Sequence, residues 1–67
     1  MTLRDRNTDG IANLAVFVKN LERGHLSTNP TLLHLKFLLR VSIDYHNKGK
    51  EEQCARKITQ AERYLLR

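Results

Sequence analysis

Apolar residues recur at helical spacing in the first third of the chain. Ile11, Leu14, Ala15, Val18 and Leu21 follow one another at intervals of three positions, with one single-position step. Residues spaced in this way lie on one face of an α-helix, and that face can pack against a core. The pattern therefore predicts a helix over about residues 9–23.

The residues around this stretch suggest where the helix begins and ends. The side-chain oxygen of Thr8 or Asp9 can accept a hydrogen bond from the free N–H groups of a first turn. Gly24 can adopt the left-handed conformation that closes many helices. Residues 1–8 are mostly polar, so we expect a flexible N-terminal arm before the helix.

The segment "TLLHLKFLLRVSIDYH", residues 31–46, is the most apolar part of the chain and fits two structures. Every odd position from Leu33 to Tyr45 is apolar, which is also the period of a half-buried strand. A strand of that length is unusual in a small domain, and no second strand of similar strength is present to pair with it. Leu, Lys and Arg propagate helices well, and Pro30 suits a first helical position. We therefore predict a helix over about 30–47, although "VSIDY" at 41–45 alone is compatible with a strand.

As a helix, this segment is apolar over most of its circumference. Its one narrow polar strip consists of Lys36, Arg40 and Asp44. A helix of this kind is normally buried on more than one side. Two modest neighbouring helices leave part of it uncovered, which predicts a homodimer packed through this helix; a monomer with a central helix is the alternative. The predicted interface residues are Leu33, Phe37, Val41 and Tyr45. Leu32, Leu35, Leu38, Leu39 and Ile43 are expected on the inner side.

A third helix is predicted over about 50–66, after Gly49 has ended the second. Glu51 and Glu52 would lie in its first turn and Arg63 in its last, as the helix dipole favours. Its inner stripe would consist of Cys54, Ile58, Ala61 and Leu65. The predicted fold is all-α: a small three-helix domain over residues 9–67.

Composition limits the classes of protein that the chain can belong to. It has 67 residues, a net charge of +5 and a single cysteine, which cannot form an intramolecular disulfide. It opens without a secretory signal, and no apolar stretch reaches the roughly 20 residues that span a membrane. We therefore expect a cytoplasmic protein with no membrane partner, and the positive charge is compatible with an acidic partner.

The residues that usually carry chemistry are few and widely spaced. His25, His34, His46 and Cys54 lack the paired spacing that brings zinc ligands to one point, so no metal site is predicted. The chain has no glycine-rich phosphate loop and no pair of carboxylates in an apolar setting. We expect neither a cofactor nor a small-molecule substrate, and no enzymatic activity.

One stretch is similar to a known DNA-binding family. "NLERGHLSTNPTLLHL" followed by "VSIDY", roughly residues 20–45, resembles the second half of the phage-repressor type of helix-turn-helix domain. The resemblance implies a recognition helix that ends near Gly24, followed by a helix led by Pro30. The distance from Pro30 to Val41 is about one helical turn shorter than in that family, and nothing upstream supplies its first two helices. We therefore transfer no base-contacting residues to this chain.

Two functions follow from these observations. The first is a small non-enzymatic regulatory protein, a candidate modulator of transcription, that contacts a partner protein through the second helix. The alternative is a basic helical protein that binds nucleic acid and regulates transcription. A membrane-surface helix is less favoured, because no segment couples a basic face to an exposed aromatic one. For the alternative, the candidate phosphate contacts are Arg4, Arg6, Arg56, Lys57 and Arg63.

Overall fold

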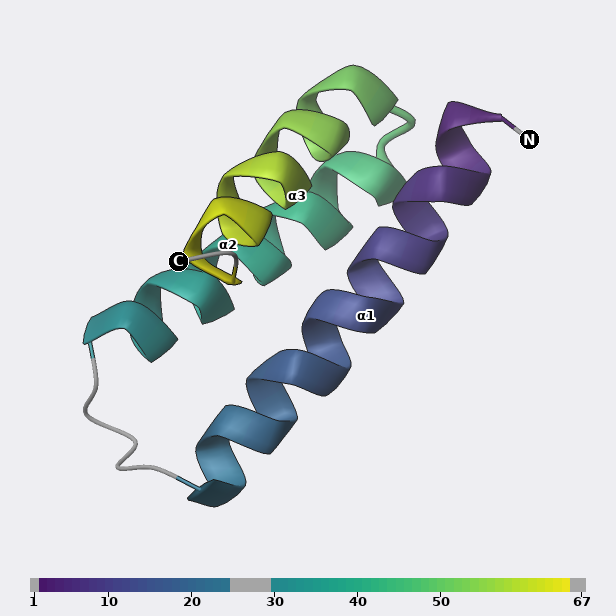
Figure 1. Ribbon diagram of the computed structural model, residues 1–67. Helices are drawn as coiled ribbons and strands as arrows, with labels where there is room; N and C mark the ends of the chain where they lie inside the picture. The colour runs from purple at the N-terminus through teal and green to yellow at the C-terminus, as the bar shows by residue number, and fades with distance from the viewer. Residues whose placement is uncertain (1, 25–29, 66–67) are drawn as a thin grey trace.

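The computed structural model describes residues 2–24 and 30–65, and these residues form three α-helices without a strand (Figure 1). The helices are α1 (Leu3–Gly24), α2 (Pro30–Asn47) and α3 (Glu51–Leu65). The all-α prediction is confirmed. Residues 41–45 belong to α2, so the strand alternative for them is wrong.

Helix α1 begins six residues earlier than the periodicity predicts, and the flexible arm expected at residues 1–8 is wrong for residues 3–8. The hydroxyl oxygen Oγ1 of Thr2 accepts a hydrogen bond from the Asp5 N–H at 3.2 Å. The Asp5 carboxylate accepts in return from the Thr2 N–H at 3.4 Å. This reciprocal pair is a capping box, so Thr2 caps the helix in place of the predicted Thr8 or Asp9.

The turn between α2 and α3 is closed by backbone hydrogen bonds of the Schellman type. The Lys50 N–H donates to the Tyr45 carbonyl at 2.9 Å, and the Gly49 N–H donates to the His46 carbonyl at 3.1 Å. Gly49 has a φ of 78°, the only positive φ among the described residues. Gly24, expected to be left-handed, is the last helical residue of α1 and has no positive φ.

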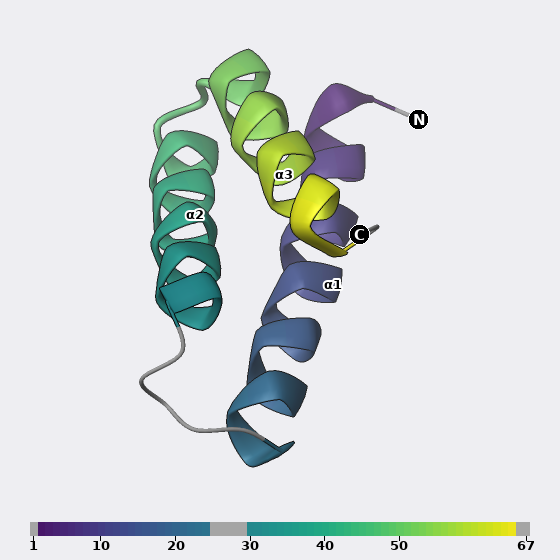
Figure 2. The same ribbon diagram turned by 60° about the vertical axis from the view of Figure 1, so that its left-hand side comes forward.

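The three helices form one bundle in which each helix contacts the other two. Helices α1 and α2 run in opposite directions, and α3 runs back from the Gly49 turn in the direction of α1 (Figures 1 and 2). The molecule measures 35 × 19 × 18 Å, and its long axis matches the roughly 33 Å expected for the 22 residues of α1. Because α1 and α2 run in opposite directions, the N-terminal end of α1 lies beside the turn between α2 and α3 (Figures 1 and 2).

The core lies where the stripes of the helices meet. Each helix contributes buried side chains at helical spacing, and Phe17, Leu21 and Leu39 pack against them while partly buried. Gly10 allows a close approach of α1 to α3, since a Cβ there would lie 3.1 Å from Cγ2 of Ile58. The buried apolar residues are Leu14, Val18, Leu32, Leu35, Leu38, Cys54, Ile58 and Ala61.

Two positions of α2 differ from the expected inner side. Ile43, expected inside, is 39% exposed, because it lies at the margin of the stripe formed by Leu35 and Leu38. Ser42 is fully buried in that stripe instead. Its hydroxyl donates to the Leu38 carbonyl at 2.7 Å, so burial leaves no polar group unsatisfied. Over the described residues, none of the helices has the length and apolar character that crossing a membrane requires.

Candidate functional site

The outward side of α2 carries an apolar surface that neither α1 nor α3 covers. We call it the α2 face and define it by Leu33, Phe37, Arg40, Val41 and Asp44. Leu33 is 54% exposed and Phe37 is 60% exposed, whereas Val41 is partly buried. Of the four predicted interface residues, Leu33 and Phe37 are therefore exposed, and Val41 and Tyr45 are partly buried.

The α2 face is hollowed toward the C-terminal half of the helix. An open depression there is lined by Phe37, Arg40, Val41, Ile43, Asp44 and Asn47. Asp44 is paired with Lys48 at 3.0 Å, and both side chains are 60% exposed, so the pair contributes only about 0–1 kcal/mol. Within residues 2–24 and 30–65, Arg40 forms no ion pair. The face thus combines an apolar centre with one positive and one negative charge.

The five candidate phosphate contacts lie in different surroundings. Arg4 donates to the Glu51 carboxylate, and Arg6 lines a groove between α1 and α3. Lys57 is partly buried, whereas Arg56 and Arg63 are exposed on α3. Arg56 and Arg63 lie seven residues apart and therefore share one face of α3.

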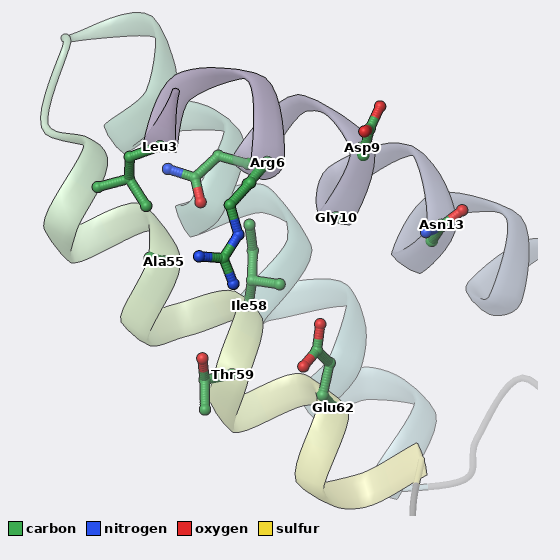
Figure 3. A pocket seen from close by; sticks show the side chains of 10 residues that line it. Leu3, Arg6, Asp9, Gly10, Asn13, Ala55, Ile58, Thr59 and Glu62 are labelled. Carbon is green, nitrogen blue, oxygen red and sulfur yellow. The ribbon is translucent and has the colours of Figure 1, made fainter. Parts of the chain in front are cut away.

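The groove between α1 and α3 is open and chemically mixed (Figure 3). Leu3 and Ile58 provide apolar surface, while Arg6 from α1 and Glu62 from α3 bring opposite charges to the groove. A solvent-open groove that carries both charges does not select one class of small ligand. Its lining residues are Leu3, Arg6, Asn7, Asp9, Gly10, Asn13, Ala55, Ile58, Thr59 and Glu62.

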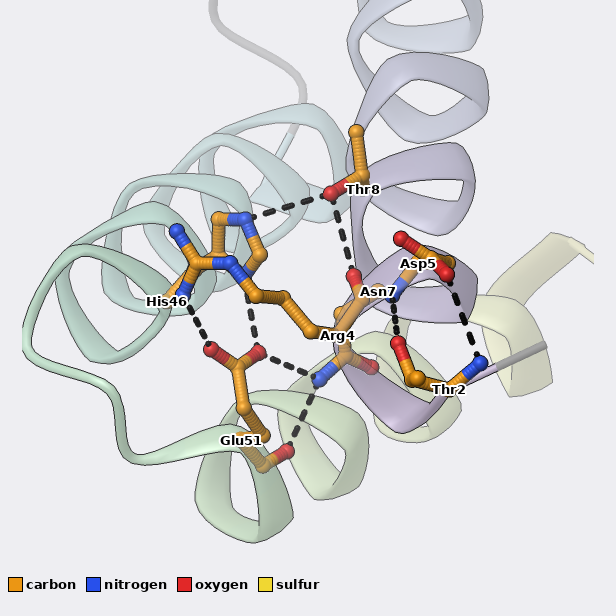
Figure 4. A network of polar contacts seen from close by, with 7 residues as sticks. All are labelled: Thr2, Arg4, Asp5, Asn7, Thr8, His46 and Glu51. Carbon is orange, nitrogen blue, oxygen red and sulfur yellow. Dashed lines mark hydrogen bonds and ion pairs between the residues drawn. The ribbon is translucent and has the colours of Figure 1, made fainter.

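A second group of side chains joins α1 to the turn between α2 and α3 (Figure 4). We call it the Glu51 cluster: Arg4, Asn7, Thr8, His46 and Glu51. Nδ2 of Asn7, which is 3% exposed, donates to the Glu51 carbonyl at 2.9 Å and to Glu51 Oε1 at 3.0 Å. Arg4 donates to Glu51 Oε2 at 3.0 Å. The carboxylate is therefore fixed from α1 through both of its oxygens.

His46 connects α2 to the same carboxylate. Its Nδ1 lies 2.8 Å from Glu51 Oε1, and its Nε2 lies 3.2 Å from Oγ1 of Thr8. The Schellman turn causes this proximity, because it places the last turn of α2 directly against the first turn of α3. Both side chains are partly buried, at 15% and 16% exposed.

Cys54 lies one turn after Glu51 on α3 and completes a group of three potential metal ligands. One ligand atom each from His46, Glu51 and Cys54 lies within 4.8 Å of the other two. Sequence spacing missed this group, since no two of these residues form a familiar zinc pair. The Gly49 turn is the signal that brings His46 and Cys54 together. His25 lies outside the described residues, and His34 packs edge-on against Tyr64 with ring centroids 5.0 Å apart.

The environment shifts the pKa values of Glu51 and Cys54 in opposite directions. The hydrogen bond from Asn7 is the main cause that lowers the pKa of Glu51; His46 and Arg4 add to the effect and partial burial opposes it. Burial raises the pKa of the Cys54 thiol, and the charge of Glu51 raises it further. A thiol kept protonated in this way is a poor nucleophile.

No protein-family model, curated protein or solved structure matches this chain, so its functional assignment depends on the geometry described above.

Proposed function

We propose that this chain is a small non-enzymatic regulatory protein that acts by helix-mediated contact through the α2 face. The supporting observation is the exposure of Leu33 and Phe37 one turn apart on that face. Adjacent exposed apolar side chains, bordered by charges, are typical of protein–protein contact surfaces. Aromatic residues such as Phe37 also supply much of the binding energy where they become buried.

The partner that best fits this face is a second copy of the chain. Leu33 precedes Phe37 by four residues and Val41 follows it by four, so the apolar centre is symmetric about Phe37. In an antiparallel pair with a two-fold axis at Phe37, each Leu33 would face the other copy's Val41. A two-fold contact requires a surface that complements itself in this way.

The charges favour the antiparallel arrangement over a parallel one. Asp44 lies seven residues after Phe37, so it would face residue 30 of the other copy, where α2 begins. The first turn of α2 has no acidic residue, and a carboxylate at a helix N-terminus is favourable by about 0.3–1 kcal/mol. A parallel pair would instead place Arg40 against Arg40 and Asp44 against Asp44.

The first experiment measures molar mass by light scattering after gel filtration, at low and high salt. We expect a dimer whose mass does not depend on salt, because the contact is mainly apolar. Phe37→Asp should give a monomer, because it introduces an unpaired charge at the centre of the contact. The matched control is Val16→Asp, since Val16 is 59% exposed and lies on α1 away from the α2 face.

The variants separate loss of contact from loss of fold. A helical far-ultraviolet circular dichroism spectrum for Phe37→Asp would show that the chain still folds, and Leu33→Lys provides a second disruption of the face. A wild-type monomer at all concentrations would overturn the dimer. Equal effects of Val16→Asp and Phe37→Asp would show that the α2 face is not specific.

A nucleic-acid-binding regulator of transcription is the second candidate, and one observation favours it. Arg56 and Arg63 are both exposed on α3, about 10 Å apart along the helix axis, and form no ion pair within the described residues. If this candidate holds, duplex DNA should bind with an affinity that falls steeply with salt. Replacing both arginines by Glu should abolish DNA binding while the dimer mass stays unchanged.

A further inference from the structure

We propose that His46, Glu51 and Cys54 form a binding site for a transition-metal ion of the Zn²⁺ class. The three side chains offer an imidazole nitrogen, a carboxylate oxygen and a sulfur, all within 4.8 Å of one another. These are the three donor types that zinc takes in proteins. The proposal is independent of the α2 face, because it depends only on the junction of the three helices.

The distances are close to those of a coordination sphere. Zinc lies about 2.0–2.3 Å from such ligands, so tetrahedrally arranged donor atoms lie roughly 3.3–3.8 Å from one another. His46 Nδ1 and Glu51 Oε1 are now 2.8 Å apart, and the sulfur lies farther out. Entry of an ion would separate the first pair slightly and draw the sulfur inward.

Thr8 is placed to hold His46 in the tautomer that binds metal through Nδ1. Its hydroxyl lies 3.0 Å from the Arg4 carbonyl, to which it donates, and 3.2 Å from His46 Nε2. When Thr8 donates to that carbonyl, it accepts from Nε2–H, and Nδ1 then points at the Glu51 carboxylate. The 2.8 Å contact between Nδ1 and Glu51 Oε1 is then a hydrogen bond that carries a proton, and a bound metal ion would take the place of that proton.

Other contacts supply the surroundings that metal sites need. Asn7 and Arg4 hold the Glu51 carboxylate in place, as residues behind a metal ligand commonly do. Cys54 is completely buried, whereas His46 and Glu51 are each about one-sixth exposed. An ion would therefore enter past His46 and Glu51 and keep a water molecule as its fourth ligand. The Cys54 thiol and the His46 Nδ1 each release a proton to solvent, because a thiolate and an unprotonated imidazole nitrogen are the forms that coordinate.

Cobalt(II) titration of the full, chelator-treated chain tests this site. Thiolate bound to Co²⁺ gives a charge-transfer absorption band in the near ultraviolet, and Cys54 is the only cysteine in the chain. We expect this band to saturate at one ion per chain and to disappear when Zn²⁺ is added. Zn²⁺ should also raise the melting temperature, because it binds only the folded chain.

Variants assign the band to two of the three ligands, His46 and Cys54. His46→Gln and Cys54→Ser should abolish it, and Thr8→Val should weaken binding about tenfold by removing the partner of Nε2. His34→Gln is the matched control, since His34 packs against Tyr64 away from this site. If Cys54→Ser does not fold, as judged by circular dichroism, His46→Gln decides the question.

The proposal is overturned by either of two results. One is the absence of a saturable thiolate band in the wild-type chain. The other is a band that His46→Gln leaves unchanged, which would place the cysteine in some other complex. A stoichiometry of one ion per two chains would also overturn it, because the three ligands of one chain would then not be sufficient.

Discussion

Asn7 is a buried polar residue whose side chain makes its contacts on another helix. At 3% exposed, it places Nδ2 between the carbonyl and the carboxylate of Glu51. Buried amides of this kind are stable only while they keep their hydrogen bonds. Asn7 therefore determines where the N-terminal end of α1 docks, a role that apolar residues fill elsewhere in the bundle.

Asn7→Ala should lower the free energy of unfolding by about 1–3 kcal/mol, because it leaves two acceptors of Glu51 without this donor. Urea denaturation followed by circular dichroism measures the change. Asn13→Ala is the control: Asn13 is exposed on the same helix, and its replacement should change stability by no more than about 0.5 kcal/mol. Equal losses in the two variants would contradict the role given to Asn7.

At the scale of elements, the short turn after α2 depends on the conformation of a single glycine. Gly49 has a φ of 78°, a region that costs other residues about 1–2 kcal/mol. Gly24 has ordinary helical geometry, and a Cβ added there would meet no atom within 4 Å. A Gly→Ala substitution can therefore be compared at one left-handed position, Gly49, and one right-handed helical position, Gly24.

Gly49→Ala should destabilise the chain by about 1–2 kcal/mol, whereas Gly24→Ala should be neutral or stabilise it by up to about 1 kcal/mol. Thermal unfolding of the two variants beside the wild type measures the difference. A stable Gly49→Ala variant would mean that the turn can adopt another geometry. In that case His46 would not be held beside Glu51.

The elements were predictable wherever a strong local signal marks their ends. Pro30 and Gly49 gave the limits of α2, and Glu51 and Arg63 marked the first and last turns of α3. The start of α1 was not predictable from periodicity, since residues 4–8 are polar and this end docks through the hydrogen bonds of Arg4, Asn7 and Thr8. The Thr2–Asp5 capping box was the available signal, and it is weaker because Asp takes the place of the usual Glu or Gln.

At the scale of the whole molecule, the proposed antiparallel pair makes a geometric prediction. On a Cys54→Ser background, Leu33→Cys and Val41→Cys chains should crosslink to each other when mixed with a short thiol reagent. Neither should crosslink efficiently to itself, because equivalent residues would lie about 12 Å apart along the axis. Crosslinking of Leu33→Cys alone would indicate a parallel pair instead, and electrophoresis under denaturing conditions distinguishes these results.

The two sites differ in how far the sequence predicted them. The α2 face follows from the excess of apolar residues around Phe37, which one helix shows by itself. The Glu51 cluster joins residues up to 47 positions apart, such as Arg4 and Glu51, and becomes visible only once three helices have been placed. A surface on one element is accessible to pattern analysis, whereas a junction of several elements requires the tertiary structure.

The position of the Glu51 cluster also has a consequence for the order in which the bundle folds. Helices α2 and α3 meet across a turn of a few residues, so their pairing needs little loop closure. The hydrogen bonds between Asn7 and Glu51 span 44 residues and must close a far longer loop. We therefore expect the hairpin of α2 and α3 to form first and the beginning of α1 to dock last. During native fluctuations the same end would detach first, which would uncover His46 and Glu51 while the rest of the bundle remains folded.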